Sequence, residues 1–395
     1  MYGFIAIPYD IIFDLIEHPY FQRLRRIKQL GLTDYVYPGA LHTRFHHALG
    51  ALHLMTQAIE VLRSKGIVIT DEEAKAVSIA ILLHDIGHGP FSHVLEHTLV
   101  NIHHEKLSLL LMKELNREFK GQLDLAIQIF NNKYPKKFLH QLVSGQLDMD
   151  RMDYLTRDSF FTGVYEGVIG YDRIIKMLSV KEGNLVVEEK GMYSIEKFLM
   201  ARRLMYWQVY LHKTVVAAEQ MLVKVFERAR ELAVSQKKIA ISENLAYFFY
   251  DLPLKPLKGK EKRKLLHHFT QLDDYDLFFA IKEFAKSDDF FLSFIAKSIL
   301  DRKLFKIEFS NKPFKGDYLN KVRHKIVHNF PVSLELAEQL MIRGQESNNV
   351  YTTSKDEILI LYKDGRIKPM SANSDFGLQS KNITKYYLCY PKILT

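Results

Sequence analysis

The chain has 395 residues but only one cysteine, Cys389. A single thiol excludes a disulfide within the chain and a zinc cluster built from cysteines. The lack of disulfides is typical of proteins from a reducing compartment. We therefore expect a cytoplasmic protein.

Long apolar runs are also missing. No stretch reaches the roughly 20 residues that span a bilayer, and the opening residues lack the pattern of a signal peptide. We find no internal repeat and no low-complexity segment. The 47% hydrophobic and 26% charged residues are typical of a soluble globular protein. We expect no membrane partner.

Positive charge and histidine are the features that the sequence has in excess. The formal net charge is +9, which favours polyanionic partners, nucleotides first and nucleic acid second. Eleven of the 17 histidines lie between His18 and His104. The chemistry is therefore expected in the first third of the chain.

Hydrophobic periodicity predicts a mainly α protein. Apolar residues recur at helical spacing over residues 21–30 and 45–62. Thr70 and Glu73 form a capping box that begins a helix carrying His84 at its end. Other helices are predicted near 104–119, 136–146, 150–159, 170–178, 194–234 and 241–303, with a short hairpin over 179–187.

The C-terminal region has a different pattern. The apolar run at residues 357–362, followed by Asp364-Gly365 and Arg366-Ile367, predicts a hairpin. Strand-like runs at 306–309 and 386–389 accompany it. We expect a small α+β subdomain over residues 305–395.

Residues 84–93 read His-Asp-Ile-Gly-His-Gly-Pro-Phe-Ser-His, directly after a buried-type apolar run. Burying these polar groups is costly unless something compensates them, and a metal ion does this well. The string resembles the signature of the HD superfamily of metal-dependent phosphohydrolases. The resemblance extends over about residues 2–230. It implies a helical HD domain over 1–235, with a helical extension over 236–304 before the C-terminal subdomain.

The resemblance also implies a set of metal ligands. Adjacent His84 and Asp85 supply two of them, His47 of the Arg44-x-x-His47 segment a third, and Asp150 the fourth. Mixed imidazole and carboxylate ligands suit one divalent cation, which could be Mn, Fe, Mg, Ni or Zn, and the sequence does not choose among these.

Each ligand taken alone has a plainer interpretation. The pair His46-His47 could be a surface or core pair, Asp150 a helix N-cap or a solvated charge, and His84 with Asp85 a buried hydrogen-bonded pair. Their joint occurrence, in the family's order and on predicted helices, favours the metal site. We interpret His42 and His53 as structural.

Within the superfamily, the closest resemblance is to the deoxynucleoside triphosphate triphosphohydrolases, the branch with the human enzyme that joins SAM and HD domains. It implies a catalytic group of His93, Glu96 and His104, with Arg44 beside it; the family usually has aspartate where this chain has Glu96. The alternatives are that His93 caps the turn after Pro90 and that His104 only begins a helix.

The same resemblance implies substrate-binding residues. Tyr154 and Asp158 are expected near the sugar, and Arg151 and Arg202 near the phosphates, although Arg-rich helices are usually solvated faces. The full implied set is Gln29, Leu30, His88, Asp148, Arg151, Tyr154, Asp158, Arg202 and Tyr206.

Members of this family are often activated by nucleotides that bind between subunits. The matching positions here are Gln22, Arg25, Arg302 and Lys306. They imply an effector such as GTP or a dNTP, and a homo-oligomer, either a dimer or a tetramer. Residues 2–5 begin partway through a family segment, so the start is either truncated or this effector wall is shortened.

The function that we expect is hydrolysis of a dNTP to a deoxynucleoside and triphosphate. Two alternatives remain: an HD phosphatase or phosphodiesterase that acts on another nucleotide, and a nucleotide or nucleic-acid sensor with a vestigial site. The sequence does not give the base preference.

Overall fold

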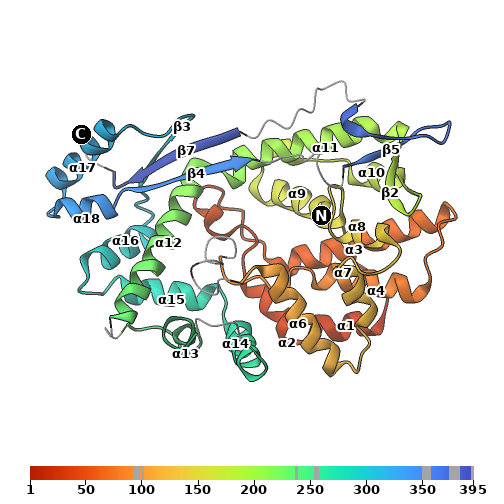
Figure 1. Ribbon diagram of the computed structural model, residues 1–395, viewed down its shortest axis with the longest axis horizontal. Coiled ribbons are helices and arrows are strands. Elements are labelled where there is room, and N and C mark those ends of the chain that lie inside the picture. Colours follow the sequence, from red (N-terminus) through yellow and green to blue (C-terminus); the bar gives the residue numbers. More distant parts are fainter. Residues whose placement is uncertain are drawn as a thin grey trace.

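The fold is mainly α, as predicted, in a computed structural model of the chain (Figure 1). The structure describes residues 1–91, 96, 98, 102–235, 239–252, 258–348, 357–372 and 383–392. No helix within these ranges combines the length and the apolar character needed to cross a membrane.

Groups of α-helices lie before and between the strands in chain order. The α-helices are α1 (Asp10–Glu17), α2 (Pro19–Gln22), α3 (Arg44–Ser64), α4 (Asp71–Leu83), α6 (His104–Glu118), α7 (Asp124–Phe130), α8 (Lys137–Val143), α9 (Met149–Thr162), α10 (Tyr171–Met177), α11 (Met192–Met205), α12 (Lys213–Val234), α13 (Glu243–Ala246), α14 (Lys260–Gln271), α15 (Asp274–Phe284), α16 (Phe290–Leu300), α17 (Gly316–Asn329) and α18 (Leu334–Gln339).

Short helical turns link these helices. Among the described residues, five have the 3₁₀ geometry: η1 (Arg23–Arg26), η2 (Gly31–Tyr35), η4 (Tyr165–Gly167), η5 (Glu189–Gly191) and η8 (Met370–Ala372). The π-helical segments η6 (Tyr206–Tyr210) and η7 (Tyr247–Asp251) also lie within these residues.

Helices α3, α4 and α9 form the part of the fold that positions the site. Helix α3 packs against both α4 and α9, and α4 is buried over nearly its whole length. The predicted capping box begins α4: the Thr70 hydroxyl accepts from the Glu73 amide, and the Glu73 carboxylate accepts from the Thr70 amide. Gly163 ends α9 in the left-handed conformation with φ 73°.

Two helix predictions were wrong in detail. Residues 21–30 do not form one α-helix, because α2 passes into η1 and Lys28 then forms an isolated bridge with Thr43. The apolar spacing of three residues matches the 3₁₀ period of three residues per turn. The predicted helix over 194–234 is interrupted at η6, and the His212 side chain caps a new helix by accepting from the Thr214 amide.

The strands form two separate sheets. The first has the order β1-β2-β5-β6, in which β1 (Leu178–Lys181) and β2 (Asn184–Glu188) form the predicted hairpin. Strand β5 (Leu359–Leu361) lies parallel to β2, with Val187 opposite Ile360, and β6 (Ile367–Pro369) is antiparallel to β5.

The second sheet has the order β3-β7-β4, formed by β3 (Lys306–Ser310), β7 (Ile383–Tyr390) and β4 (Ile342–Asn348). Its strands are antiparallel. The two C-terminal sheet regions lie at opposite ends of one side of the molecule (Figure 1). The predicted hairpin near 357–367 is therefore present, but it joins the sheet of the N-terminal part rather than that of β3 and β7.

One continuous hydrophobic core extends from Ile11 to Tyr390. Residues from α3, α12, α16 and β7 all contribute buried side chains to it. The domain boundaries near residues 235 and 304 stay predictions.

The buried carboxylate of Glu73 gives a test of the start of α4. It accepts from Tyr134 (2.6 Å) and Lys136 (2.7 Å) as well as from the Thr70 amide. Burial raises the pKa of Glu73, but these partners outweigh burial and lower it. We expect Glu73→Gln to destabilise the protein at pH 7 by about 1–3 kcal/mol, because charged hydrogen-bond partners are lost.

The loss has a defined pH dependence. A carboxylate with a depressed pKa stabilises the folded state when the pH is above its unfolded-state pKa. This stabilisation is lost as the pH falls through its folded-state pKa. The unfolding free energies of the variant and the parent should converge in acid, as measured by urea titration. Exposed Glu72→Gln is the control and should change little at any pH; an equal loss at pH 3 and pH 7 would contradict the role of Glu73.

Candidate metal centre and active-site cavity

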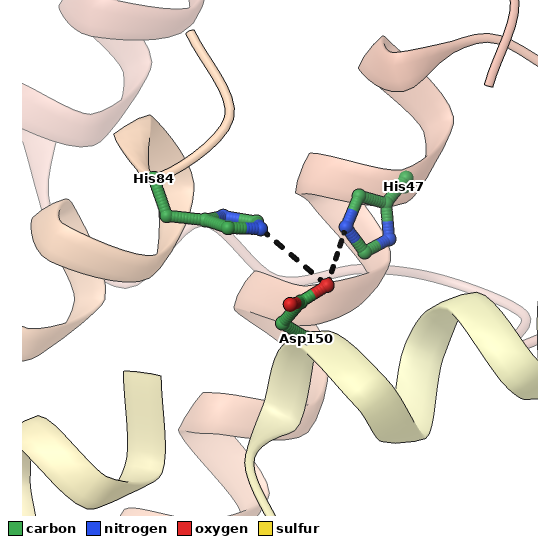
Figure 2. Close-up of side chains that lie close together, drawn as sticks. All are labelled: His47, His84 and Asp150. Carbon is green, nitrogen blue, oxygen red and sulfur yellow. Dashed lines mark ion pairs between the residues drawn. The ribbon is translucent and has the colours of Figure 1, made fainter. Parts of the chain in front are cut away.

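Three side chains from three helices converge in the interior. His47 comes from α3, His84 follows the last residue of α4, and Asp150 lies in the first turn of α9 (Figure 2). Asp150 Oδ1 lies 3.1 Å from His47 Nε2 and 3.6 Å from His84 Nε2. His47 is fully buried.

The hydrogen bonds of the two imidazoles orient the rings. Nδ1 of His84 lies 2.6 Å from the Ile81 carbonyl oxygen, which only accepts, so this nitrogen donates. Nδ1 of His47 lies 2.8 Å from Asp153 Oδ2. Asp153 is itself held by Arg157 through two contacts of 2.9 Å. Both Nε2 atoms therefore face the same point with their lone pairs.

This arrangement fits a divalent cation. The Nε2 atoms of His47 and His84 are buried and make no hydrogen bond in the described part of the chain. One ligand atom from each of His47, His84 and Asp150 lies within 4.8 Å of the others. A carboxylate behind a metal-binding histidine, as Asp153 stands behind His47, is the usual support for such a ligand.

The charges around this point are strongly coupled. Burial lowers the pKa of His47, but the neighbouring carboxylates of Asp150 and Asp153 outweigh burial and raise it to about 10. Burial raises the pKa of Asp150, and the two histidines reverse this and hold it well below its usual range. A cation binds an imidazole nitrogen only in its unprotonated form, so metal binding and protonation of the two histidines would compete at this point.

Asp85 lies beside the group. Its Oδ1 is 3.4 Å from His84 Nε2, and its Oδ2 is 3.8 Å from His47 Nε2. It also accepts from Arg44 Nη1 at 2.5 Å, and His88 Nε2 lies 3.2 Å away. The structure thus brings together all four predicted ligands and holds Asp85 in place through Arg44.

A second cluster adjoins the first through stacked rings. The His88 and His104 ring centroids are 3.9 Å apart, and the planes differ by 17°. The Glu96 carboxylate accepts from the His104 amide at 2.9 Å and lies 3.0 Å from its Nδ1. The structure therefore joins Glu96 to His104 as expected. His93 lies outside the described residues.

A cavity of about 540 Å³ opens over these clusters. Its walls come from the start of the chain, from α9 and from the region of α11 and α12. It is lined by Lys28, Gln29, Leu30, Gly31, Thr33, Arg44, Asp85, His88, Phe91, His104, Asp150, Arg151, Tyr154, Asp158, Arg202, Tyr206, Tyr210, Leu211 and Glu219. All the predicted substrate residues except Asp148 line it.

Asp148 has a supporting position. It caps α9 by accepting from the Arg151 amide at 2.7 Å, and its other oxygen accepts from the Gly145 amide and from Arg151 Nη1 at 2.6 Å. The N-cap role considered for Asp150 thus belongs to Asp148. Asp148 contacts the side chain of Arg151, and Arg151 lines the cavity.

Hydrogen bonds and ring contacts also hold the residues that the sequence predicted near the sugar, Asp158 and Tyr154. Asp158 is buried, and its oxygens lie 2.7 Å from His42 Nε2 and 2.7 Å from the Tyr210 hydroxyl, which donates. Tyr154 and Tyr210 meet edge to face. The π-helical η6 places both Tyr206 and Tyr210 on the cavity wall; such segments are frequent at functional sites.

The residues predicted to bind an effector lie elsewhere. Gln22 Oε1 accepts from Arg25 Nε at 2.8 Å, and the Arg25 guanidinium lies over the Phe45 ring. Arg302 donates to the Tyr35 carbonyl, and Lys306 pairs with Glu308 at 2.7 Å. None of these four lines the cavity. Their effector role stays a prediction.

Arg23 supports the site but was not among the residues predicted from the sequence. Its guanidinium is fully buried and donates to the Ile86 and His88 carbonyls (3.0 and 2.9 Å) and to the Leu272 carbonyl (3.1 Å). Burial lowers the pKa of Arg23 to about 9. The hydrogen bonds of Arg23 to the Ile86 and His88 carbonyls hold the turn after Asp85, and this turn orients His88. The contact with residue 272 is too remote in sequence for any local pattern to indicate it.

Comparison with known proteins identifies the family of the chain. A model of the HD domain matches residues 44–158, which include His47, His84 and Asp150, and a model of the HD associated region matches residues 169–247. The chain belongs to the HD domain family of metal-dependent phosphohydrolases.

Full-length relatives and solved structures extend the similarity. An uncharacterized protein of Bacillus subtilis, YwfO, is 30% identical over all of this chain and 91% of its own length. The crystal structure of a phosphohydrolase from Bacteroides thetaiotaomicron is 50% identical, with a TM-score of 0.92 over 99% of this chain and 98% of that one.

A relative with a stated substrate is more distant. The Dictyostelium discoideum deoxynucleoside triphosphate triphosphohydrolase SAMHD1 homolog is 31% identical over 58% of this chain and 48% of its own length.

Arg23 gives a test of how the turn after Asp85 is held. We expect Arg23→Met to destabilise the protein by about 3 kcal/mol or more, because three buried carbonyls lose their donor and each costs about 1–3 kcal/mol. Thermal and urea unfolding measure the loss. Arg203, an exposed arginine on α11, is the matched control, and Arg203→Met should stay within about 0.5 kcal/mol. Equal stability of the two variants would contradict the role of Arg23.

Proposed function

We propose that this protein hydrolyses deoxynucleoside triphosphates to deoxynucleoside and triphosphate. The observation that carries the proposal is the wall of one cavity, which joins Asp85 and Asp150 to three arginines and three tyrosines. Asp85 and Asp150 line one part of it, and Arg151 and Arg202 line the next. A cation site beside fixed positive charge is the combination that phosphoryl chemistry requires.

We propose His47, His84, Asp85 and Asp150 as the ligands of one divalent cation. The buried Nε2 atoms of the two histidines support this set, as does the support of His47 by Asp153. When bound, the cation supplies an activated water and positive charge next to the reacting phosphate. Nitrogen and oxygen ligands are compatible with several metals.

The chain's own residues have distinct tasks in this proposal. Arg151 and Arg202 bind phosphate oxygens, and Arg44 keeps Asp85 turned toward the metal centre. The Glu96 carboxylate lies against Nδ1 of His104, so Nε2 is the atom that hands a proton to the departing 5′ oxygen. Tyr154 and Asp158 contact the sugar, and Tyr154 is packed edge to face against Tyr210.

The reaction itself is tested by its products. Purified protein is incubated with each of the four dNTPs and Mn²⁺, Mg²⁺, Fe²⁺ or Zn²⁺, with and without GTP, and the products are separated by ion-exchange chromatography. We expect equal amounts of deoxynucleoside and inorganic triphosphate. Release of orthophosphate alone would contradict the proposed reaction and favour another HD phosphatase activity. Binding without turnover under every metal would favour a sensor.

Asp150 tests the metal ligands. We expect Asp150→Asn to lower bound metal and turnover by more than about 100-fold, since loss of a supporting group alone costs 10–100-fold. Metal content is measured by mass spectrometry after dialysis. Asp172→Asn, on the exposed side of α10, should leave both unchanged. Full metal occupancy in the Asp150 variant would refute this ligand.

The neighbouring histidines give a matched pair for the proton donor. His104 lines the cavity, whereas the side chain of His103 is half exposed. We expect His104→Gln to lower kcat by about 10²–10⁴-fold with bound metal retained. His103→Gln should stay within about threefold of the parent, an expectation from its exposure. Equal losses in both variants would mean that the loop, not the His104 imidazole, is responsible.

A further inference from the structure

Glu219 is an unpaired acid in the wall of the active-site cavity. It lies on α12, about two turns after the helix begins at Lys213, and its side chain is partly buried. It makes no hydrogen bond or ion pair with any residue that the structure describes. A carboxyl in such a position is costly to bury without a hydrogen-bond partner. A ligand in the cavity could supply that partner.

The chemistry of Glu219 distinguishes it from the metal and phosphate groups of the cavity. Burial is the main cause that raises its pKa, to about 8, and Glu346 on β4 is the other. A carboxyl oxygen accepts hydrogen bonds, whereas the triphosphate of a nucleotide offers oxygens that themselves accept. The N–H groups of the base are therefore the partners that suit Glu219.

The cavity that Glu219 lines also has apolar wall residues. Helix α12 packs against η2, and the segment at and just before η2 supplies Leu30, Gly31 and Thr33 to the wall, with Leu211 preceding α12. Gln29 lines the same cavity, and its side-chain oxygen is buried without a hydrogen-bond partner in the described residues. Apolar walls with a few unsatisfied polar atoms are the usual form of a specific small-molecule site.

We propose that Glu219 binds the nucleobase of the substrate by accepting an N–H hydrogen bond from the base edge. The proposal rests on the proposed function, since the metal and arginine end would hold the triphosphate of the same molecule. All four bases present at least one N–H on the edge that pairs in a duplex, so one acceptor serves each of them. Glu219 is thus a specificity residue that rejects ligands without such a group.

The test separates base recognition from phosphate recognition. Binding to the metal-free protein is measured by calorimetry for the four dNTPs, for 2′-deoxynebularine triphosphate, whose base edge carries no N–H, and for inorganic triphosphate. In the parent protein we expect dATP to bind about tenfold tighter than its nebularine analogue. Glu219→Leu should abolish this difference, lower dNTP affinity about tenfold and leave triphosphate binding within twofold.

The controls keep the outcomes distinct. Glu227→Leu, on the same helix but paired with Lys224 outside the cavity, should behave as the parent. Removal of an unpaired acid does not threaten the fold, and thermal unfolding checks this. If the metal-free parent binds no nucleotide, the base-binding role of Glu219 is refuted, and the proposed function fails only if the metal-loaded parent also releases no triphosphate from any dNTP. If it binds dNTPs but Glu219→Leu changes none of them, or weakens triphosphate equally, the base-binding role of Glu219 is refuted and the proposed function stands.

Discussion

The fold depends on holding several charged groups inside a helical core. Asp153 is completely buried and lies between His47 and Arg157. A buried carboxylate without partners would be strongly unfavourable, so α3 and α9 must pack with these residues in register. That register turns the Nε2 atom of His47 toward Asp150, and it also sets where α4 must deliver His84. Arg44 pairs with Asp85, and Arg23 binds the carbonyls of the turn that follows it.

The sequence predicted the part of the site that lies in compact motifs. His84 and Asp85 follow a buried helix, and the proposed ligands His47 and Asp150 lie on two helices that pack together. Local patterns predicted the capping box at Thr70 and the β1–β2 hairpin because each is built from neighbouring residues. The same holds for most helix boundaries, which depend on periodicity alone.

The features of the fold and the site that the sequence did not predict depend on contacts between distant segments. Residues 194–234 have continuous helical periodicity, yet the chain adopts a π-helical segment at η6, where Tyr210 reaches the buried carboxylate of Asp158. The role of Asp148 required knowing which aspartate of the segment begins α9. Glu219 looks like one more charge on an amphipathic helix, and only the cavity and the nearby β4 distinguish it from a solvated residue.

The parallel pairing of β2 with β5 has a consequence for biosynthesis. The two strands are joined across a gap of 173 residues, from Val186 to Leu359. At about 5–20 residues per second, a ribosome needs roughly 10–30 s to make the intervening chain. During that interval the edge of β2 has no neighbour, and exposed strand edges favour aggregation. The nascent chain therefore has a window in which a chaperone, or another copy of the chain, can occupy the place of β5.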